Sequence, residues 1–89
     1  MRLVYLDYSA TTPLDSRVMD AMMPHFVENF GNASSVHAYG RKARAVLEES
    51  REAIARCIRA PIDSLIFTSG GTEADNCAVR GTATAMKSR

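Results

Sequence analysis

The residues best suited to chemistry form one short polar segment, Ser69 to Thr72, between an apolar run and a helical stretch. A strand that enters such a turn and continues into a helix leaves main-chain N–H groups unpaired beside the positive end of the helix dipole. Gly70 and Gly71 have no Cβ, so an anion can approach the main chain, and the Thr72 hydroxyl adds a donor. The segment is therefore a candidate phosphate site.

The same segment also has a purely structural interpretation. A tight strand-to-helix connection uses glycines too, and Thr72 with Asp75 would form an approximate capping box. The lysine and the wider glycine spacing of a P-loop are missing, and so is the dinucleotide-binding fingerprint. From this motif alone, both interpretations stay open.

Two expected elements precede the longest helix. Residues 3–6 are apolar and aromatic and predict a strand or an extended arm, and the turn-forming residues 9–13 predict a loop. Asp15 can cap a short amphipathic helix, which Pro24 is expected to disturb. Its apolar stripe is expected to pack in a core rather than to line a ligand pocket, and it consists of Val18, Met19, Met22, Met23 and Phe26.

The longest periodic segment predicts a helix that is capped by Ser34 or Ser35 and runs to about Arg59. Residues 64–68 then have the length and aromatic content of a buried strand. A weaker helical stretch follows from Ala74. The chain thus predicts an α/β fold class with one convincing strand.

Composition limits the function classes. The 89 residues allow one small domain, and an apolar fraction of 46% with 24% charged residues is typical of a soluble globular protein. A net charge of +1 disfavours binding to nucleic acid or anionic lipid. No run approaches the roughly 18 apolar residues of a membrane span, so we expect a cytoplasmic protein. Cys57 and Cys77 lack metal-ligand spacing, and no metal site is expected.

Three blocks together resemble the cysteine desulfurases, which belong to the class V aminotransferases and to the fold-type I pyridoxal 5'-phosphate (PLP) enzymes. The blocks are residues 5–13 (YLDYSATTP), 30–37 (FGNASSVH) and 66–76 (IFTSGGTEADN). They occur in the family's order, and the resemblance covers residues 3 to about 81. It implies the N-terminal portion of a fold-type I PLP-dependent transferase, a helix-rich fragment with one or two strands of a mostly parallel sheet.

The resemblance also implies a division of residues 1–89 and a set of site residues. Residues 1–14 would form an extended arm and active-site loop, and residues 64–81 a strand, a phosphate loop and a helix. Gly71 and Thr72 would bind the PLP phosphate. The family usually has alanine where this chain has Gly71, a change that should affect rigidity more than binding. The residues expected near the substrate are Ala10, Thr11, Thr12 and Asn32, the last in a loop that shapes the same region or a dimer contact.

The catalytic groups of the family lie in later parts of the full-length enzyme. They are the lysine that holds the cofactor, the aspartate on its ring nitrogen, a base and the sulfur-accepting cysteine. Lys42, Lys87, Cys57 and Cys77 do not match these groups, so no catalytic residue is expected here. His37 is expected to be a helix-start residue that packs or hydrogen-bonds locally.

The leading functional hypothesis is therefore an inactive fragment of a cysteine desulfurase. The complete enzyme would convert L-cysteine to L-alanine and pass persulfide to a sulfur-acceptor or scaffold protein for iron-sulfur cluster or thiolation pathways. The apolar helix faces and the strand edge would require the missing C-terminal portion or another copy in a homo-oligomer. The alternatives are a fragment of a selenocysteine lyase or an aminotransferase, and a non-catalytic module that dimerises through residues 36–58.

Overall fold

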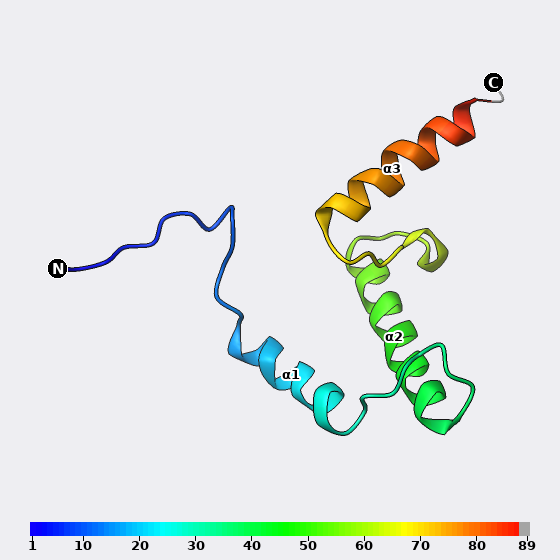
Figure 1. Ribbon diagram of the computed structural model, residues 1–89, viewed down its shortest axis with the longest axis horizontal. Helices are drawn as coiled ribbons and strands as arrows, with labels where there is room; N and C mark the ends of the chain where they lie inside the picture. Colours follow the sequence, from blue (N-terminus) through cyan, green and yellow to red (C-terminus); the bar gives the residue numbers. More distant parts are fainter. Residues whose placement is uncertain (88–89) are drawn as a thin grey trace. The chain divides into compact units, whose positions relative to one another are not determined.

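The computed structural model describes residues 1–87 (Figure 1). It contains the helices α1 (Ser16–Val27), α2 (Ala38–Cys57) and α3 (Gly71–Met86) and the short 3-10 helix η1 (Ile62–Ser64). The chain divides within α2 into two compact units, Met1–Glu49 and Ser50–Arg89. Each unit is described by itself.

Helix α1 begins at the cap that the sequence predicts. Asp15 has extended backbone angles, and its carboxylate accepts a hydrogen bond from the Arg17 main-chain N–H at 2.8 Å. The Arg17 guanidinium also contacts this carboxylate at 2.8 Å. Hydrogen bonds from the Arg17 side chain and then from its main chain lower the pKa of Asp15. The carboxylate is therefore ionised at neutral pH and satisfies a donor that the helix itself leaves unpaired.

Pro24 lies inside α1 without ending it. A proline has no N–H, so the helix loses the bond to the carbonyl four residues earlier. The Pro24 carbonyl nevertheless accepts hydrogen bonds from Glu28 and Asn29 at 2.9 and 2.8 Å. The proline thus removes one hydrogen bond without ending the helix, which continues to Val27.

The cap predicted for α2 at Ser34 or Ser35 is wrong. His37 precedes the helix, and its Nδ1 accepts a hydrogen bond from the Gly40 N–H at 3.3 Å, which confirms a local role for this histidine. The serines are held in a preceding turn, because the Asn32 side chain and carbonyl accept from the main-chain N–H groups of Ser34 and Ser35, each at 2.9 Å.

Two glycines allow this turn to fold back onto the first turn of α2. A Cβ on Gly40 would lie 2.0 Å from the Ser35 carbonyl oxygen, and one on Gly31 would lie 2.4 Å from the Tyr39 carbonyl oxygen. Gly40 is buried. The rings of Phe30 and Tyr39 stack beside this junction with centroids 6.2 Å apart. Close backbone approach therefore requires glycine at positions 31 and 40.

The strand expected over residues 64–68 is not formed, and residues 1–87 contain no strand. Ser64 instead ends η1, where its hydroxyl donates to the Pro61 carbonyl at 2.7 Å. Leu65 does have the extended angles φ −93° and ψ 124°. An extended segment becomes a strand only when a neighbour pairs with its N–H and C=O groups. No such neighbour exists in the described part of the chain, so the sheet of the expected α/β class is not confirmed.

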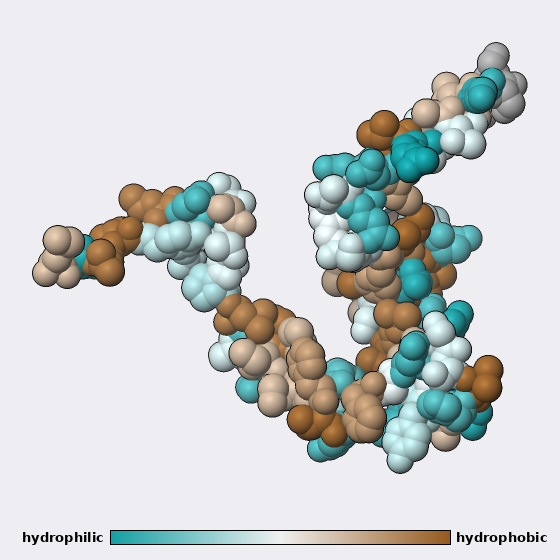
Figure 2. Space-filling model, in the orientation of Figure 1, coloured by the Kyte–Doolittle hydropathy of each residue, from teal (hydrophilic) through white to brown (hydrophobic). Residues whose placement is uncertain are grey.

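The expected core is also missing from residues 1–87. Ala55, at 3% exposure, is the buried hydrophobic residue among them, whereas Phe26 of α1 is 65% exposed. Figure 2 shows hydrophobic surface over α1. The prediction that the α1 stripe packs in a core is thus not met, because the described chain offers it no buried layer. Among the described residues, no helix is long and apolar enough to cross a membrane.

The glycine contacts predict opposite effects for two alanine substitutions. Gly40→Ala should destabilise the junction of the 30–37 loop and α2 by about 1–3 kcal/mol or more, because the new Cβ meets backbone atoms. Gly81→Ala is the matched control, since a Cβ there meets nothing within 4 Å, and it should stabilise α3 by about 0.5–1 kcal/mol. Urea denaturation of both variants, followed by circular dichroism, tests this. Equal stability changes of the same sign would contradict it.

Candidate functional site

The candidate anion loop, residues 68–72, leads into α3 in the unit Ser50–Arg89. Gly70 is the N-cap residue and has an extended backbone without a side-chain capping bond. The helical bonding begins when the Ala74 N–H donates to the Gly70 carbonyl at 3.1 Å. The N–H groups of Gly71 and Thr72 belong to the first turn and therefore have no acceptor within the helix. They lie at the positive end of the helix dipole, which favours an anion.

The two glycines of this loop are not required by the packing of the chain. A Cβ on Gly70 or Gly71 would meet no heavy atom within 4 Å. This contrasts with Gly40, where a Cβ would collide with backbone. The space beside the first turn of α3 is therefore open, and a bulky anion can reach the N–H groups of Gly71 and Thr72.

A different side chain from the one predicted contacts the residues before α3. The Glu73 carboxylate accepts hydrogen bonds from the Ser69 main-chain N–H, at 2.8 Å, and from the Ser69 hydroxyl. The predicted capping box of Thr72 and Asp75 is not observed; the Thr72 carbonyl instead accepts from Asn76 Nδ2 at 2.8 Å. The contact between Ser69 and Glu73 was missed because it spans four residues, one more than the usual capping box.

The Ser69 hydrogen bonds change the acidity of Glu73. The bond from the Ser69 hydroxyl and then that from its N–H lower the pKa of the Glu73 carboxyl, against a smaller opposing effect of desolvation. Each bond favours the charged form because a carboxylate is the stronger acceptor. Glu73 is therefore an anion at neutral pH, anchored to the residue before the N-cap.

Two further side chains hold the segment that leads into the loop. The Thr68 hydroxyl donates to the Gly70 carbonyl at 3.1 Å. Arg51 of α2 donates to the Leu65 carbonyl, and its guanidinium carbon lies 4.8 Å from the centroid of the Phe67 ring. Arg51 thus contacts residues that lie 14 and 16 positions later in the chain. The helical pattern of α2 does not predict these contacts. Thus α2 anchors the extended segment in place of a neighbouring strand.

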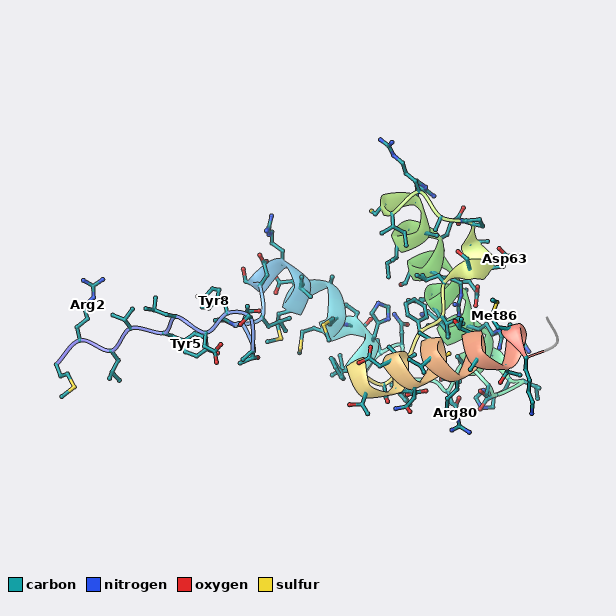
Figure 3. All side chains as sticks on the ribbon, turned by 90° about the horizontal axis from the view of Figure 1, so that it is seen from above. Arg2, Tyr5, Tyr8, Asp63, Arg80 and Met86 are labelled. Atoms are coloured by element: carbon teal, nitrogen blue, oxygen red, sulfur yellow. The ribbon has the colours of Figure 1, made fainter. Side chains whose placement is uncertain are left out.

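The predicted loop at residues 9–13 is confirmed in the unit Met1–Glu49, where residues 8–10 form a turn and Thr11 and Thr12 follow it without regular structure. The Asp7 carbonyl accepts from the Ala10 and Thr11 N–H groups at 3.0 and 3.4 Å. The Tyr5 hydroxyl lies 2.9 Å from the Asp7 carbonyl oxygen and 3.1 Å from that of Thr11. Figure 3 shows Tyr5 on the extended amino-terminal segment. One tyrosine thus closes this turn from the arm that precedes it.

Asn32 belongs to the same unit, in the turn before α2. Its side-chain oxygen is occupied by the Ser34 N–H at 2.9 Å. It also borders an open hollow of about 310 Å³, whose lining residues are Phe30, Gly31, Asn32, Ser35, His37 and Tyr39. The site residues predicted from sequence therefore fall into two groups, Gly71 with Thr72 in one unit and the remaining four in the other.

No metal centre accompanies these groups in the described part of the chain, residues 1–87, where no set of three or more His, Cys, Asp or Glu side chains is placed to hold an ion. The two free cysteines, Cys57 and Cys77, are exposed. Cys57 ends α2 and Cys77 lies within α3. Both therefore belong to helices rather than to a loop.

Comparison with known proteins identifies the family. The aminotransferase class-V family matches residues 4–89, so the chain belongs to this family. It is 53% identical over 88 residues to the cysteine desulfurase IscS of Dictyoglomus turgidum, covering 99% of this chain and 22% of the relative. It is 53% identical over 87 residues to the putative cysteine desulfurase IscS 1 of Bacillus subtilis, covering 98% of this chain and 23% of the relative.

A third relative shows the same relationship. The cysteine desulfurase IscS 1 of Archaeoglobus fulgidus is 51% identical over 77 residues, or 86% of this chain and 20% of the relative. The chain thus spans about a fifth of the length of the curated relatives it matches. The resemblance to cysteine desulfurases is confirmed, and the family match supports a fragment of a fold-type I PLP enzyme.

The lowered pKa of Glu73 predicts how the loop responds to acid. A depressed pKa in the folded state means that the contact with Ser69 stabilises the loop above the unfolded pKa, and that this stabilisation is lost as the pH falls through the folded pKa. When the pH is lowered below the usual pKa range of a glutamate, the amide resonance of Ser69 should therefore shift. An NMR titration measures this, with Glu73→Gln as the control that should show no such step. A Ser69 amide shift that stays constant in the wild type would contradict the prediction.

The contacts of Arg51 predict the effect of removing its guanidinium group. Arg51→Met should release residues 65–67 from α2 and weaken the unit by about 1–3 kcal/mol, because it removes a charged hydrogen bond and a cation–π contact. Arg51→Lys keeps the charge and should lose less. Loss of the nuclear Overhauser effects between residue 51 and the Phe67 ring reports the release. Unchanged chemical shifts at Leu65 and Phe67 in Arg51→Met would argue against this role.

Proposed function

We propose that this chain is the N-terminal part of a PLP-dependent cysteine desulfurase and that Gly71 and Thr72 bind the phosphate of PLP. The open first turn of α3 is the observation that carries this proposal. Its N–H groups lack helical acceptors, and the space in front of Gly70 and Gly71 is empty of protein atoms. The similarity to cysteine desulfurases over 99% of the chain supports the same assignment.

The residues present fit a phosphate group. Main-chain N–H groups, a helix N-terminus and a hydroxyl are the donors that bind phosphate in proteins. Thr72 offers two donors, its main-chain N–H and its hydroxyl. Gly71 offers a main-chain N–H with no side chain in front of it. The carboxylate nearest in sequence, that of Glu73, is engaged by Ser69. These two hydrogen bonds hold the Glu73 carboxylate at Ser69, and the donors of Gly71 and Thr72 remain for the ligand.

The contribution of this chain to the reaction is binding and orientation. Bound PLP supplies the electron sink that the chemistry of its amino-acid substrate requires. Gly71 and Thr72 would donate hydrogen bonds to the phosphate, and the α3 dipole would stabilise its charge. Lys42 lies within α2 and Lys87 follows α3. The covalent and acid–base groups would come from the remaining four fifths of the enzyme.

The substrate and partners of the complete protein follow as part of this proposal. It would take L-cysteine, release L-alanine and pass sulfur to an acceptor or scaffold protein in the cytoplasm. Residues 1–14, with Ala10, Thr11 and Thr12, would lie beside the substrate, and Asn32 would shape the same region or a dimer contact. Residues 64–81 would carry the phosphate loop and complete a strand once a neighbouring strand is present.

The alternatives have less support. The relatives with about 50% identity are cysteine desulfurases, which favours this substrate over selenocysteine or a transamination substrate. The exposed apolar face of α1 needs a cover, as it would in a dimerising module. Such a module would have no use for an open anion loop, whereas the N-terminal part of an enzyme needs both the loop and the cover.

The proposal predicts that Thr72 selects for the phosphate of the cofactor. In the complete polypeptide, Thr72→Ala should weaken PLP binding by about tenfold, or about 1.4 kcal/mol, and leave binding of pyridoxal, which has no phosphate, unchanged. Thr72→Ser should retain the affinity because it keeps the hydroxyl. Thr82→Ala is the matched control within α3. The visible absorbance of bound PLP measures the affinity of the wild type and of the three variants.

The same absorbance tests the fragment itself. The 89-residue chain mixed with PLP should show the spectrum of bound cofactor only when its downstream portion is added. A Thr72→Ala enzyme that binds PLP as tightly as the wild type would overturn the assignment of the phosphate site. A stable dimer of the chain that ignores both PLP and the downstream portion would favour the module.

A further inference from the structure

We propose that Glu73 is the positioning residue of the anion loop, whose hold on Ser69 keeps the N–H groups of Gly71 and Thr72 available to phosphate. This inference rests on the proposed function. It gives Glu73 a part in setting the shape of the loop that requires no contact with cofactor or substrate. The evidence is the hydrogen bonding around Ser69, the absence of packing at the glycines and the charge of the Glu73 carboxylate.

The first step is the direction in which Glu73 reaches. A glutamate at the third helical position commonly accepts the N–H of the N-cap residue. Glu73 occupies this position, since α3 begins at Gly71, but its carboxylate accepts from Ser69, the residue before the N-cap. It also accepts from the Ser69 hydroxyl. Both hydrogen bonds therefore come to the Oε2 oxygen of Glu73 from donors outside the helix, and neither engages the N–H groups of the first turn.

The second step is that little else determines the backbone at this point. The N-cap residue Gly70 has no side chain, and its backbone makes no side-chain capping bond. A Cβ at Gly70 or Gly71 would touch nothing within 4 Å, so packing does not hold these residues. Glycine also has the largest conformational freedom to lose. Hydrogen bonds from outside the glycines must therefore set the shape of the loop.

Two side chains provide those bonds. Thr68 donates its hydroxyl to the Gly70 carbonyl at 3.1 Å, and this carbonyl also accepts the Ala74 N–H at 3.1 Å. Glu73 holds the N–H of Ser69 at 2.8 Å. The Ser69 N–H and the Gly70 carbonyl, which lie on either side of the peptide bond between these residues, are thereby both hydrogen-bonded to residues of α3. Of the two residues, only Glu73 is charged, so its bonds to Ser69 are the stronger type.

The third step concerns competition with the ligand. An ionised carboxylate in the first turn of a helix is attracted to the same N–H groups that would bind phosphate. Anchoring on two Ser69 donors keeps the Glu73 carboxylate away from the N–H groups of Gly71 and Thr72. A neutral amide of the same shape can keep the Ser69 N–H bond, whereas an alanine cannot. A comparison of Glu73→Gln with Glu73→Ala therefore distinguishes a positioning role of the side chain from an effect of its charge alone.

The test compares two ligands on the complete polypeptide. Glu73→Ala should weaken PLP binding by about tenfold, the loss expected for about 1.4 kcal/mol, with pyridoxal binding unchanged. Glu73→Gln should restore the PLP affinity to within about threefold of the wild type, because its amide oxygen accepts the Ser69 N–H. Ser69→Ala removes only the hydroxyl donor and should fall between them. Asp75→Ala, which changes a nearby acid of α3, is the control and should bind both ligands as the wild type does.

Each other outcome has a defined meaning. If Glu73→Ala and Glu73→Gln both bind PLP as tightly as the wild type or more tightly, Glu73 is a bystander or a competitor, and the inference is overturned. Equal weakening of PLP and pyridoxal by Glu73→Ala would also overturn it, since the role would then be general stability. If the wild type itself does not prefer PLP to pyridoxal, the phosphate site of the proposed function fails instead.

Discussion

The candidate site depends most on the main-chain N–H groups at the start of α3, which have no acceptor within the helix. An N-terminus normally satisfies such donors with a capping side chain, as Asp15 does for α1. At α3 the N-cap is Gly70, which has no side chain, and the nearby carboxylate of Glu73 is bound to Ser69. The free N–H groups at the starts of the two helices are thus treated in opposite ways: those of α1 have a capping side chain, and those of α3 do not. The N-terminus of α1 is closed by the side chain of its cap, and the open N-terminus of α3 is the proposed anion site.

A second constraint is the shortage of buried surface. Hydrophobic burial is the main stabilising term in folding, and Ala55 is the buried hydrophobic residue among residues 1–87. The chain spans about a fifth of its relatives, so most of the surface that would cover its helices lies in the remaining sequence. This explains why contacts that hold residues 65–67, such as those of Arg51, involve polar and aromatic groups rather than a sheet. The site on α3 is therefore built on local hydrogen bonds, and the rest of the protein would stabilise it.

Predictions that depend on interactions within about four residues were largely correct. Asp15 caps α1, His37 bonds locally at the start of α2, and a helix follows the glycines of the anion loop. The errors at the helix caps have a common cause. Ser34 and Ser35 do not cap α2, because Asn32 draws both into an earlier turn. In each error, a neighbouring polar group offered a competing hydrogen bond that the pattern of apolar residues does not reveal.

The sequence by itself determined the family, the three helices and the position of the open glycine turn, because helical periodicity, capping residues and glycine act over short distances along the chain. Only the tertiary structure decided that residues 64–68 have no partner strand in the described chain, that Arg51 contacts residues 65 and 67 instead, and that Glu73 turns to Ser69. A strand requires a partner whose position no local pattern specifies. A flexible carboxylate likewise chooses among several donors by their placement in space, and that placement exists only once the backbone around it has folded.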